Sequence, residues 1–408
     1  MKLKSTLLIG SLALAAGNAS AATRVFNITG ATAFRASANN AIISILGGAG
    51  TTKYAFVGTA GIGGTNRAIF VGTMAAFPTD TIIVRVSWSG STQGIKDTED
   101  NASIQFLDDV VREDGTAGAG NPVTTAGYNL GASGLDAPEF ENAVAQWSFS
   151  DVDKLLSERP NATFVGGPVG VVPFMFLSGE GAPATFTNMS DQLHKTLWAT
   201  GQLPIAFFTG DIADATTVLA TGRNNGSGTR ATILAETEYG AFTSVTQFGA
   251  TFQGSRTDAY PTGKLLATIE FGNGGGPSNS DIREVLTRRS DDLTFGGSPV
   301  DAIFAGYLTI SDAIAAVGEG AKALTYNGVP FSVEGVKKGL YSLWGYQQFY
   351  LDADASADET TFDTAFRAAI PATLVEPNAI AIPNMSVIRT GGDGGPIAPG
   401  PNYPAKNP

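Results

Sequence analysis

The 408-residue chain contains no cysteine and only one histidine, His194. The lack of cysteine excludes disulfide bonds, thiol catalysis, cysteine-ligated zinc and a lipid anchor on cysteine. A single imidazole excludes histidine-rich metal sites and leaves at most one histidine as a general base. We expect His194 at the surface, because it stands in the segment SDQLHKTLWATG, which has the pattern of an amphipathic surface helix.

Positive charge is also scarce. Lys and Arg total 25 against 37 Asp and Glu, which gives a net charge of −12. A chain of this charge lacks the positive field that holds a nucleic-acid backbone, so we expect no nucleic-acid partner. Hydrophobic residues make up 43% of the chain, charged residues only 15%, and 51 residues are glycine. This composition is typical of a globular, loop-rich protein rather than a disordered one.

Long hydrophobic runs are absent. The N-terminal run Thr6–Gly17 is twelve residues long, whereas a membrane-spanning helix needs roughly 20 apolar residues. Lys2 and Lys4 precede this run, and the small residues Ala19-Ser20-Ala21 follow it. Residues 1–21 are therefore predicted to be a secretory signal peptide. We expect a periplasmic protein, with secretion or a cell-surface location as the alternatives.

Strand-like and helix-like patterns alternate along the rest of the chain. Predicted strands cover residues 25–29, 81–88, 162–167, 171–177, 216–222, 265–272 and 340–351. Predicted helices cover residues 33–46, 190–201, 229–242, 280–289 and 360–370. This alternation predicts an α/β fold in which ligands bind near the carboxyl ends of strands.

Two segments have the composition of turns. Residues 96–146 are rich in Gly, Asn, Asp and Thr, and are expected to form an insertion or an extended surface loop. Residues 391–408 contain five glycines and five prolines, so residues 385–408 are predicted to be a flexible tail without a core of its own.

The clearest chemical motif is RNNGSGT, residues 223–229, between a predicted strand and a predicted helix. Its two glycines permit backbone conformations that direct successive N–H groups toward one point. The serine and threonine add hydroxyl donors, the helix start adds the positive end of a dipole, and Arg223 adds a full charge. The motif predicts an oxyanion site, although it lacks the lysine of a P-loop. The alternative is a Gly-Ser turn that only caps the helix.

Other segments resemble a known family in the same order along the chain. They are TGATAF at 29–34, GSTQG at 90–94, the SD pair at 150–151 and RNNGSGT. This set resembles the phosphate ABC-transporter substrate-binding proteins of the type II periplasmic-binding-protein superfamily. The resemblance implies a two-lobed α/β fold, with a ligand cleft between lobes that are joined by two hinge strands. Lobe I would comprise residues 22–168 and 341–384, and lobe II residues 169–339.

The resemblance also implies which residues bind phosphate. Carried over position by position, they are Thr32, Phe34, Ser91, Asp151, Arg223, Ser227, Gly228 and Thr229. An ionised Asp151 can only accept hydrogen bonds, so it requires a ligand that still carries a proton, such as hydrogen phosphate rather than sulfate. Asp151 could instead cap the following segment VDKLLSE. The family carries a second acid where this chain has Asn225, so Asp151 would be the one carboxylate that selects for a protonated ligand.

The resemblance thus implies a non-catalytic, monomeric binding protein, without cofactor or metal, that delivers phosphate or a similar oxyanion to an ABC permease. One alternative is an exported surface or structural protein that keeps the fold with little or no transport role. A second is an exported phosphatase relative, which is disfavoured because no nucleophile–base–metal set is visible. Neighbouring permease and ATPase genes would favour transport, whereas surface-layer or secretion genes would favour the structural alternative.

Overall fold

The computed structural model of the chain describes residues 21–58, 61–108, 128–130 and 139–404. Residues 1–20 of the predicted signal peptide lie outside the described residues. The described chain is a mixed α/β protein built on one large sheet, so the predicted fold class is confirmed. In this described part, no helix is both long enough and apolar enough to cross a membrane.

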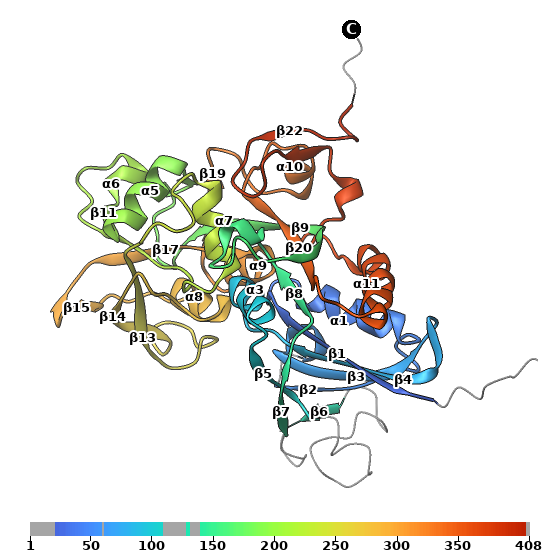
Figure 1. Cartoon of the computed structure of the whole chain (residues 1–408). Coiled ribbons are helices and arrows are strands. Elements are labelled where there is room, and N and C mark those ends of the chain that lie inside the picture. Colours follow the sequence, from blue (N-terminus) through green and yellow to red (C-terminus); the bar gives the residue numbers. More distant parts are fainter. Residues whose placement is uncertain (1–20, 59–60, 109–127, 131–138, 405–408) are drawn as a thin grey trace, which may run out of the picture.

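The large sheet has the strand order β11-β12-β17-β9-β20-β8-β1-β4-β3-β2-β6, and β18 pairs with β9 beside this path. The strands at one end form the first lobe: β1 (Thr23–Gly30), β2 (Lys53–Val57), β3 (Arg67–Met74), β4 (Phe77–Ser87), β6 (Tyr128–Leu130) and β8 (Trp147–Ser150). The strands at the other end form the second lobe: β11 (Gln202–Pro204), β12 (Thr217–Ala220), β17 (Ala302–Thr309) and β18 (Lys322–Ala323). Figure 1 shows β1, β2, β3 and β4 toward the bottom of the molecule and β11 at its upper left.

Two long strands connect the lobes. β9 (Phe164–Ser178) pairs with β20 through residues 164–173 and with β17 through residues 174–178. β20 (Trp344–Asp352) pairs with both β8 and β9. This is the predicted two-lobed architecture with two hinge strands. The exact lobe limits stay a prediction, because β9 and β20 belong to both halves of the sheet.

Smaller sheets complete each lobe. The second lobe carries a four-stranded sheet of β13 (Gln247–Gln253), β14 (Lys264–Gly272), β15 (Thr294–Phe295) and β16 (Ser298–Pro299). Short parallel strands β10 (Asn188–Met189) and β19 (Thr325–Tyr326) pair with each other. In the segment predicted as a surface loop, β5 (Ser103–Leu107) pairs with β7 (Phe140–Val144). The described parts of that segment, including β6, are therefore regular structure, and residues 109–127 and 131–138 lie outside the described residues.

Most of the helices bury part of their surface, and five of them begin at a serine that caps the helix. They are α1 (Arg35–Ile45), α2 (Gly61–Gly64), α3 (Ser91–Glu99), α5 (Asp191–Thr200), α6 (Ala206–Thr209), α7 (Gly228–Glu236), α8 (Asn279–Leu286), α9 (Ile310–Gly318), α10 (Val333–Lys337) and α11 (Ala357–Ala369). The short 3-10 helices are η1 (Lys154–Leu156), η2 (Ile370–Thr373) and η3 (Ile382–Asn384). Serine side chains cap α5, α7, α8, α10 and α11, and the caps of α8 and α11 are complete capping boxes.

The expected surface position of His194 is wrong. Its side chain is fully buried, stacked on Trp198 at 4.4 Å between ring centroids and beside Phe176 at 5.3 Å. Burial lowers its pKa to about 3, so the imidazole is neutral at ordinary pH. Helix α5 packs its apolar face inward as predicted, and His194 belongs to that face.

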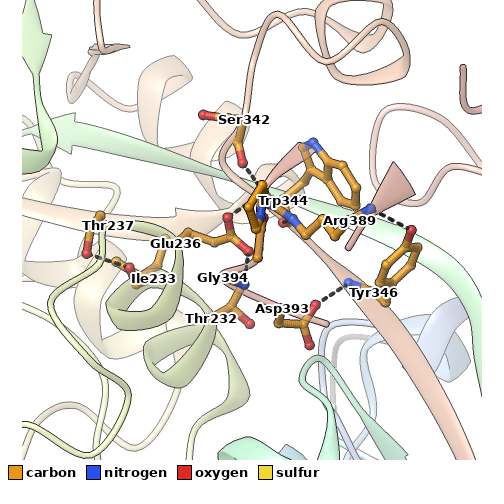
Figure 2. Close-up of polar contacts among 12 residues, drawn as sticks. Thr232, Ile233, Glu236, Thr237, Ser342, Trp344, Tyr346, Arg389, Asp393 and Gly394 are labelled. Atoms are coloured by element: carbon orange, nitrogen blue, oxygen red, sulfur yellow. Dashed lines mark hydrogen bonds and ion pairs between the residues drawn. The ribbon is translucent and has the colours of Figure 1, made fainter. Parts of the chain in front are cut away.

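The predicted flexible tail is also wrong for residues 385–404. Strand β21 (Val387–Arg389) pairs with β22 (Ile397–Pro399), and the turn between them packs against α7 and β20 (Figure 2). Buried charges hold this segment in place. Arg389 forms an ion pair with Glu236, and Asp393 accepts the backbone N–H groups of Tyr346 (3.0 Å) and Asp153 (2.7 Å). The C-terminal segment therefore contacts lobe I, a hinge strand and lobe II.

Candidate anion-binding site

A cavity of about 560 Å³ lies between the lobes. Lobe I contributes the start of α1 and Ser89, which follows β4. Lobe II contributes Arg223, the segment Pro277–Ser280 and the start of α9. The cavity thus lies near the carboxyl ends of β1, β4 and β12, where the α/β pattern predicts a ligand.

Arg223 is the central cation of this cavity. Its side chain is only 3% exposed, and its guanidinium donates to three neutral acceptors: Gly276 O (3.2 Å), Pro277 O (2.9 Å) and Asn279 Oδ1 (2.7 Å). Burial lowers its pKa, but an arginine remains protonated in a protein. Among the described residues, no carboxylate forms an ion pair with Arg223. Its charge is therefore buried without a paired countercharge.

The charged groups of the cavity wall are two arginines and one acid. Arg35 at the start of α1 and Arg223 face the cavity from opposite lobes, and Asp312 of α9 is the acid. Arg35 donates to Asn66 Oδ1 at 2.6 Å, another neutral partner. The rest of the polar wall consists of hydroxyl and amide groups. In a chain of net charge −12, this wall carries an excess of positive charge, which favours an anionic ligand.

Beside the cavity, the starts of two helices meet at Asp151. Asp151 follows β8, α3 begins at Ser91 and α7 begins at Gly228. A side chain at Gly228 would overlap the Ser91 hydroxyl group and approach the Asp151 side chain, so only glycine fits there. Thr232 on α7 also donates to the backbone carbonyl of Asp151 at 3.1 Å. The contacts bring segments of both lobes together.

Asp151 is a buried carboxyl group with an incomplete set of partners. Burial raises its pKa to about 6, while the Ser91 hydroxyl, Arg223 and the Thr229 hydroxyl act in the opposite direction. Its Oδ1 atom has no hydrogen-bond partner in the part of the chain that the structure describes. A buried acceptor in this state fits a ligand that can donate a proton.

The structure divides the eight predicted ligands into groups. Ser91, Asp151, Gly228 and Thr229 lie together where α3 and α7 begin, and Ser227 caps α7 by accepting the Arg230 N–H at 3.4 Å. Thr32 and Arg223 line the cavity. Phe34 differs, because its ring is buried against Phe149 at 5.5 Å, so only its backbone could face a ligand. Their roles as ligands stay predictions.

Several polar residues of the cavity were not identified from the sequence. Asn279, Thr309 and Asp312 line it together with Arg35. Asn279 stands in GNGGGPSNSDIREVL, where the order Ser-Asn-Ser-Asp marks the start of a helix. That signal gives the helix boundary but not the contact with Arg223. Asn225 lies outside this cavity and lines a smaller one of about 140 Å³ with Arg230.

No protein-family model matches the chain, and no curated protein matches it significantly. Solved structures similar to this chain include several phosphate-binding proteins. A substrate-binding protein assigned to phosphate ABC transport, from Clostridium perfringens with bound phosphate, is 11% identical with a TM-score of 0.47, over 88% of this chain and 100% of that one. An ABC-type phosphate transport receptor from Vibrio cholerae is 14% identical with a TM-score of 0.41, over 84% and 93%.

A phosphate-binding protein from Stenotrophomonas maltophilia is 11% identical with a TM-score of 0.38, over 88% of this chain and 87% of that one.

Proposed function

We propose that this chain is an exported solute-binding protein that captures inorganic phosphate, or a similar tetrahedral oxyanion, between its lobes for an ABC-type importer. The observation that carries the proposal is the buried Arg223 guanidinium, which faces the cavity with only neutral hydrogen-bond partners. Burying an unpaired charge is energetically unfavourable unless an oppositely charged group binds to it. An anionic ligand would supply that partner.

The starts of α3 and α7 add donors beside Arg223. Both helices have nine residues, and their first turns leave backbone N–H groups free of intrahelical partners. Ser91 and Thr229 would add hydroxyl donors, and Thr32 and the Phe34 backbone would complete the site from lobe I. Bringing all of these groups onto one ligand requires the lobes to move relative to each other, because the helix starts now pack directly together.

Asp151 would set the selectivity of this site. Its unpartnered Oδ1 atom can accept a proton donor on hydrogen phosphate or hydrogen arsenate. Sulfate carries no proton at neutral pH, so the negatively charged Asp151 carboxylate would repel it. We therefore expect phosphate and arsenate to bind more tightly than sulfate.

A binding role fits the site better than a catalytic one. His194 is the single histidine of the chain, and its ring lies in an aromatic core instead of the cavity wall. Capture by a periplasmic protein, release to a permease and a monomeric state are all parts of the proposal.

Calorimetry on the mature protein tests the ligand. The protein should first be unfolded and refolded to remove bound anions, and then titrated with phosphate, arsenate and sulfate. Saturable binding of phosphate at one site per chain supports the proposal. If none of the three anions binds at millimolar concentration, the proposed function is wrong and an exported structural role becomes the better reading.

A further inference from the structure

A chain of three hydrogen bonds leads from Arg223 across the cavity wall. Arg223 Nη1 donates to Asn279 Oδ1 at 2.7 Å, and Asn279 Nδ2 donates to Thr309 Oγ1 at 2.8 Å. The Thr309 hydroxyl in turn donates to Asp312 Oδ2 at 3.3 Å. Because a guanidinium can only donate, the amide oxygen of Asn279 must face Arg223 and its NH2 group must face Thr309. Every member of the chain has one possible orientation.

This series of hydrogen bonds holds the Asp312 carboxylate near Arg223 but out of contact with it. Asp151 and Asp312 both act on Arg223 electrostatically, yet among the described residues neither forms an ion pair with it. Two neutral side chains separate Asp312 from the guanidinium. Asn279 is 8% exposed and occupies the position from which a carboxylate would form a close ion pair with the guanidinium. An amide of the same size satisfies the geometry and leaves the guanidinium without a direct ion pair.

We propose that Asn279 determines the specificity of the cavity for anions by holding Arg223 with a neutral acceptor, so that the ligand has to bring the countercharge. This inference rests on the proposed function for its ligand. It assigns to Asn279 a role beyond fixing a loop, because a loop could be fixed equally well by an aspartate.

The variant Asn279→Asp tests the role at constant size. A carboxylate beside Arg223 would compete with the ligand as an internal anion, so phosphate affinity should fall about tenfold or more. Without ligand, the variant should unfold at the same urea concentration as the wild type or at a higher one, since the buried charge is now paired. Asn279→Leu removes both hydrogen bonds and should instead lower the urea midpoint.

The chain offers a matched control. Arg230 is also buried without a carboxylate partner in the described residues, and Asn273 Oδ1 accepts from it at 2.6 Å. Neither residue lines the 560 Å³ cavity. Asn273→Asp therefore makes the same chemical change at a neighbouring arginine and should leave phosphate affinity unchanged.

The outcomes separate the two proposals. If Asn279→Asp binds phosphate as tightly as the wild type, or if its urea midpoint falls as far as that of Asn279→Leu, then Asn279 is only a structural residue. If the wild type binds none of the oxyanions, the proposed function is wrong. If Asn279→Asp then still keeps or raises the urea midpoint, Asn279 remains the residue that leaves Arg223 without an ion pair. Loss of affinity in Asn273→Asp as well would show a general charge effect and overturn the assignment.

Discussion

The ion pair between Arg389 and Glu236 should stabilise the whole protein, because it fastens the C-terminal segment to α7. Both side chains are only 3% exposed. Besides the ion pair, Arg389 donates to the carbonyl oxygens of Trp344 (3.1 Å), Gly395 (2.9 Å) and Ser342, as Figure 2 shows in part. Its guanidinium also lies 4.3 Å from the centre of the Trp344 ring. The variant Arg389→Met removes all of these polar contacts but keeps an apolar side chain of similar length.

The expected cost follows from what remains in the variant. Glu236 would stay buried with the Gly394 N–H (2.8 Å) as its polar contact from the C-terminal segment. Burial already raises the pKa of Glu236, and Arg389 opposes this rise. Removing one member of a buried ion pair costs about 3–5 kcal/mol, since the other charge is left uncompensated. The free energy of unfolding should therefore fall by about that amount.

Urea denaturation followed by circular dichroism measures this change. The double variant Arg389→Met/Glu236→Leu should recover most of the loss, because apolar residues can replace a buried pair. Lys338→Met removes a partner from the exposed pair with Glu334 and serves as the control, with no expected change. A loss below about 1 kcal/mol for Arg389→Met would mean that the C-terminal segment does not contribute to global stability, and the reasoning would be refuted.

Four further measurements bear on the site and the core. Phosphate at 100 times its Kd should raise the free energy of unfolding of anion-free protein by about 2.7 kcal/mol, and the absence of a melting shift at millimolar phosphate would contradict the proposed function. Arg223→Ala should weaken the binding of every oxyanion about 10- to 100-fold in calorimetry, whereas Arg289→Ala, an exposed change of the same charge, should not. The Asp151 carboxyl should become protonated as the pH falls below about 6, so the preference for phosphate over sulfate should decrease there. In Asp151→Asn, the ratio of the phosphate and sulfate affinities should no longer depend on protonation of this side chain. Below about pH 6.5, His194 binds a proton in the unfolded chain but not in the folded one. The free energy of unfolding should therefore fall by about 2 kcal/mol between pH 8 and pH 5. In urea titrations, His194→Phe should lose this part of the pH dependence.

The strand pattern was readable from the sequence wherever the residues themselves prefer extended structure. The β-branched runs at residues 25–29 and 81–88 predicted β1 and β4, and residues 162–167 and 171–177 predicted the two parts of β9. The two parts form one strand through residues 168–170, which neither predicted strand included. Local preferences therefore gave the strands but not their continuity.

Residues whose environment depends on distant partners were predicted less well. The amphipathic pattern around His194 gave the helix, but the partners that cover its ring, Phe176 and Tyr239, come from separate segments. The many glycines and prolines after residue 390 predicted a flexible tail, whereas the buried contacts of Arg389 and Asp393 hold this segment against the rest of the protein. The contact between Arg223 and Asn279 spans 56 residues of sequence. No local pattern contains such pairings, because they are decided by how the sheet assembles.

The position of β20 has a consequence for the order in which the protein can fold. In the sheet β20 lies between β8 and β9, yet in the chain it follows both of them by more than 160 residues. The two halves of the sheet can therefore join only after residue 352 has been made and inserted. Folding that waits for such distant pairings is slow. The proposed export would benefit from this delay, since the central strand of the sheet is among the last parts to become available.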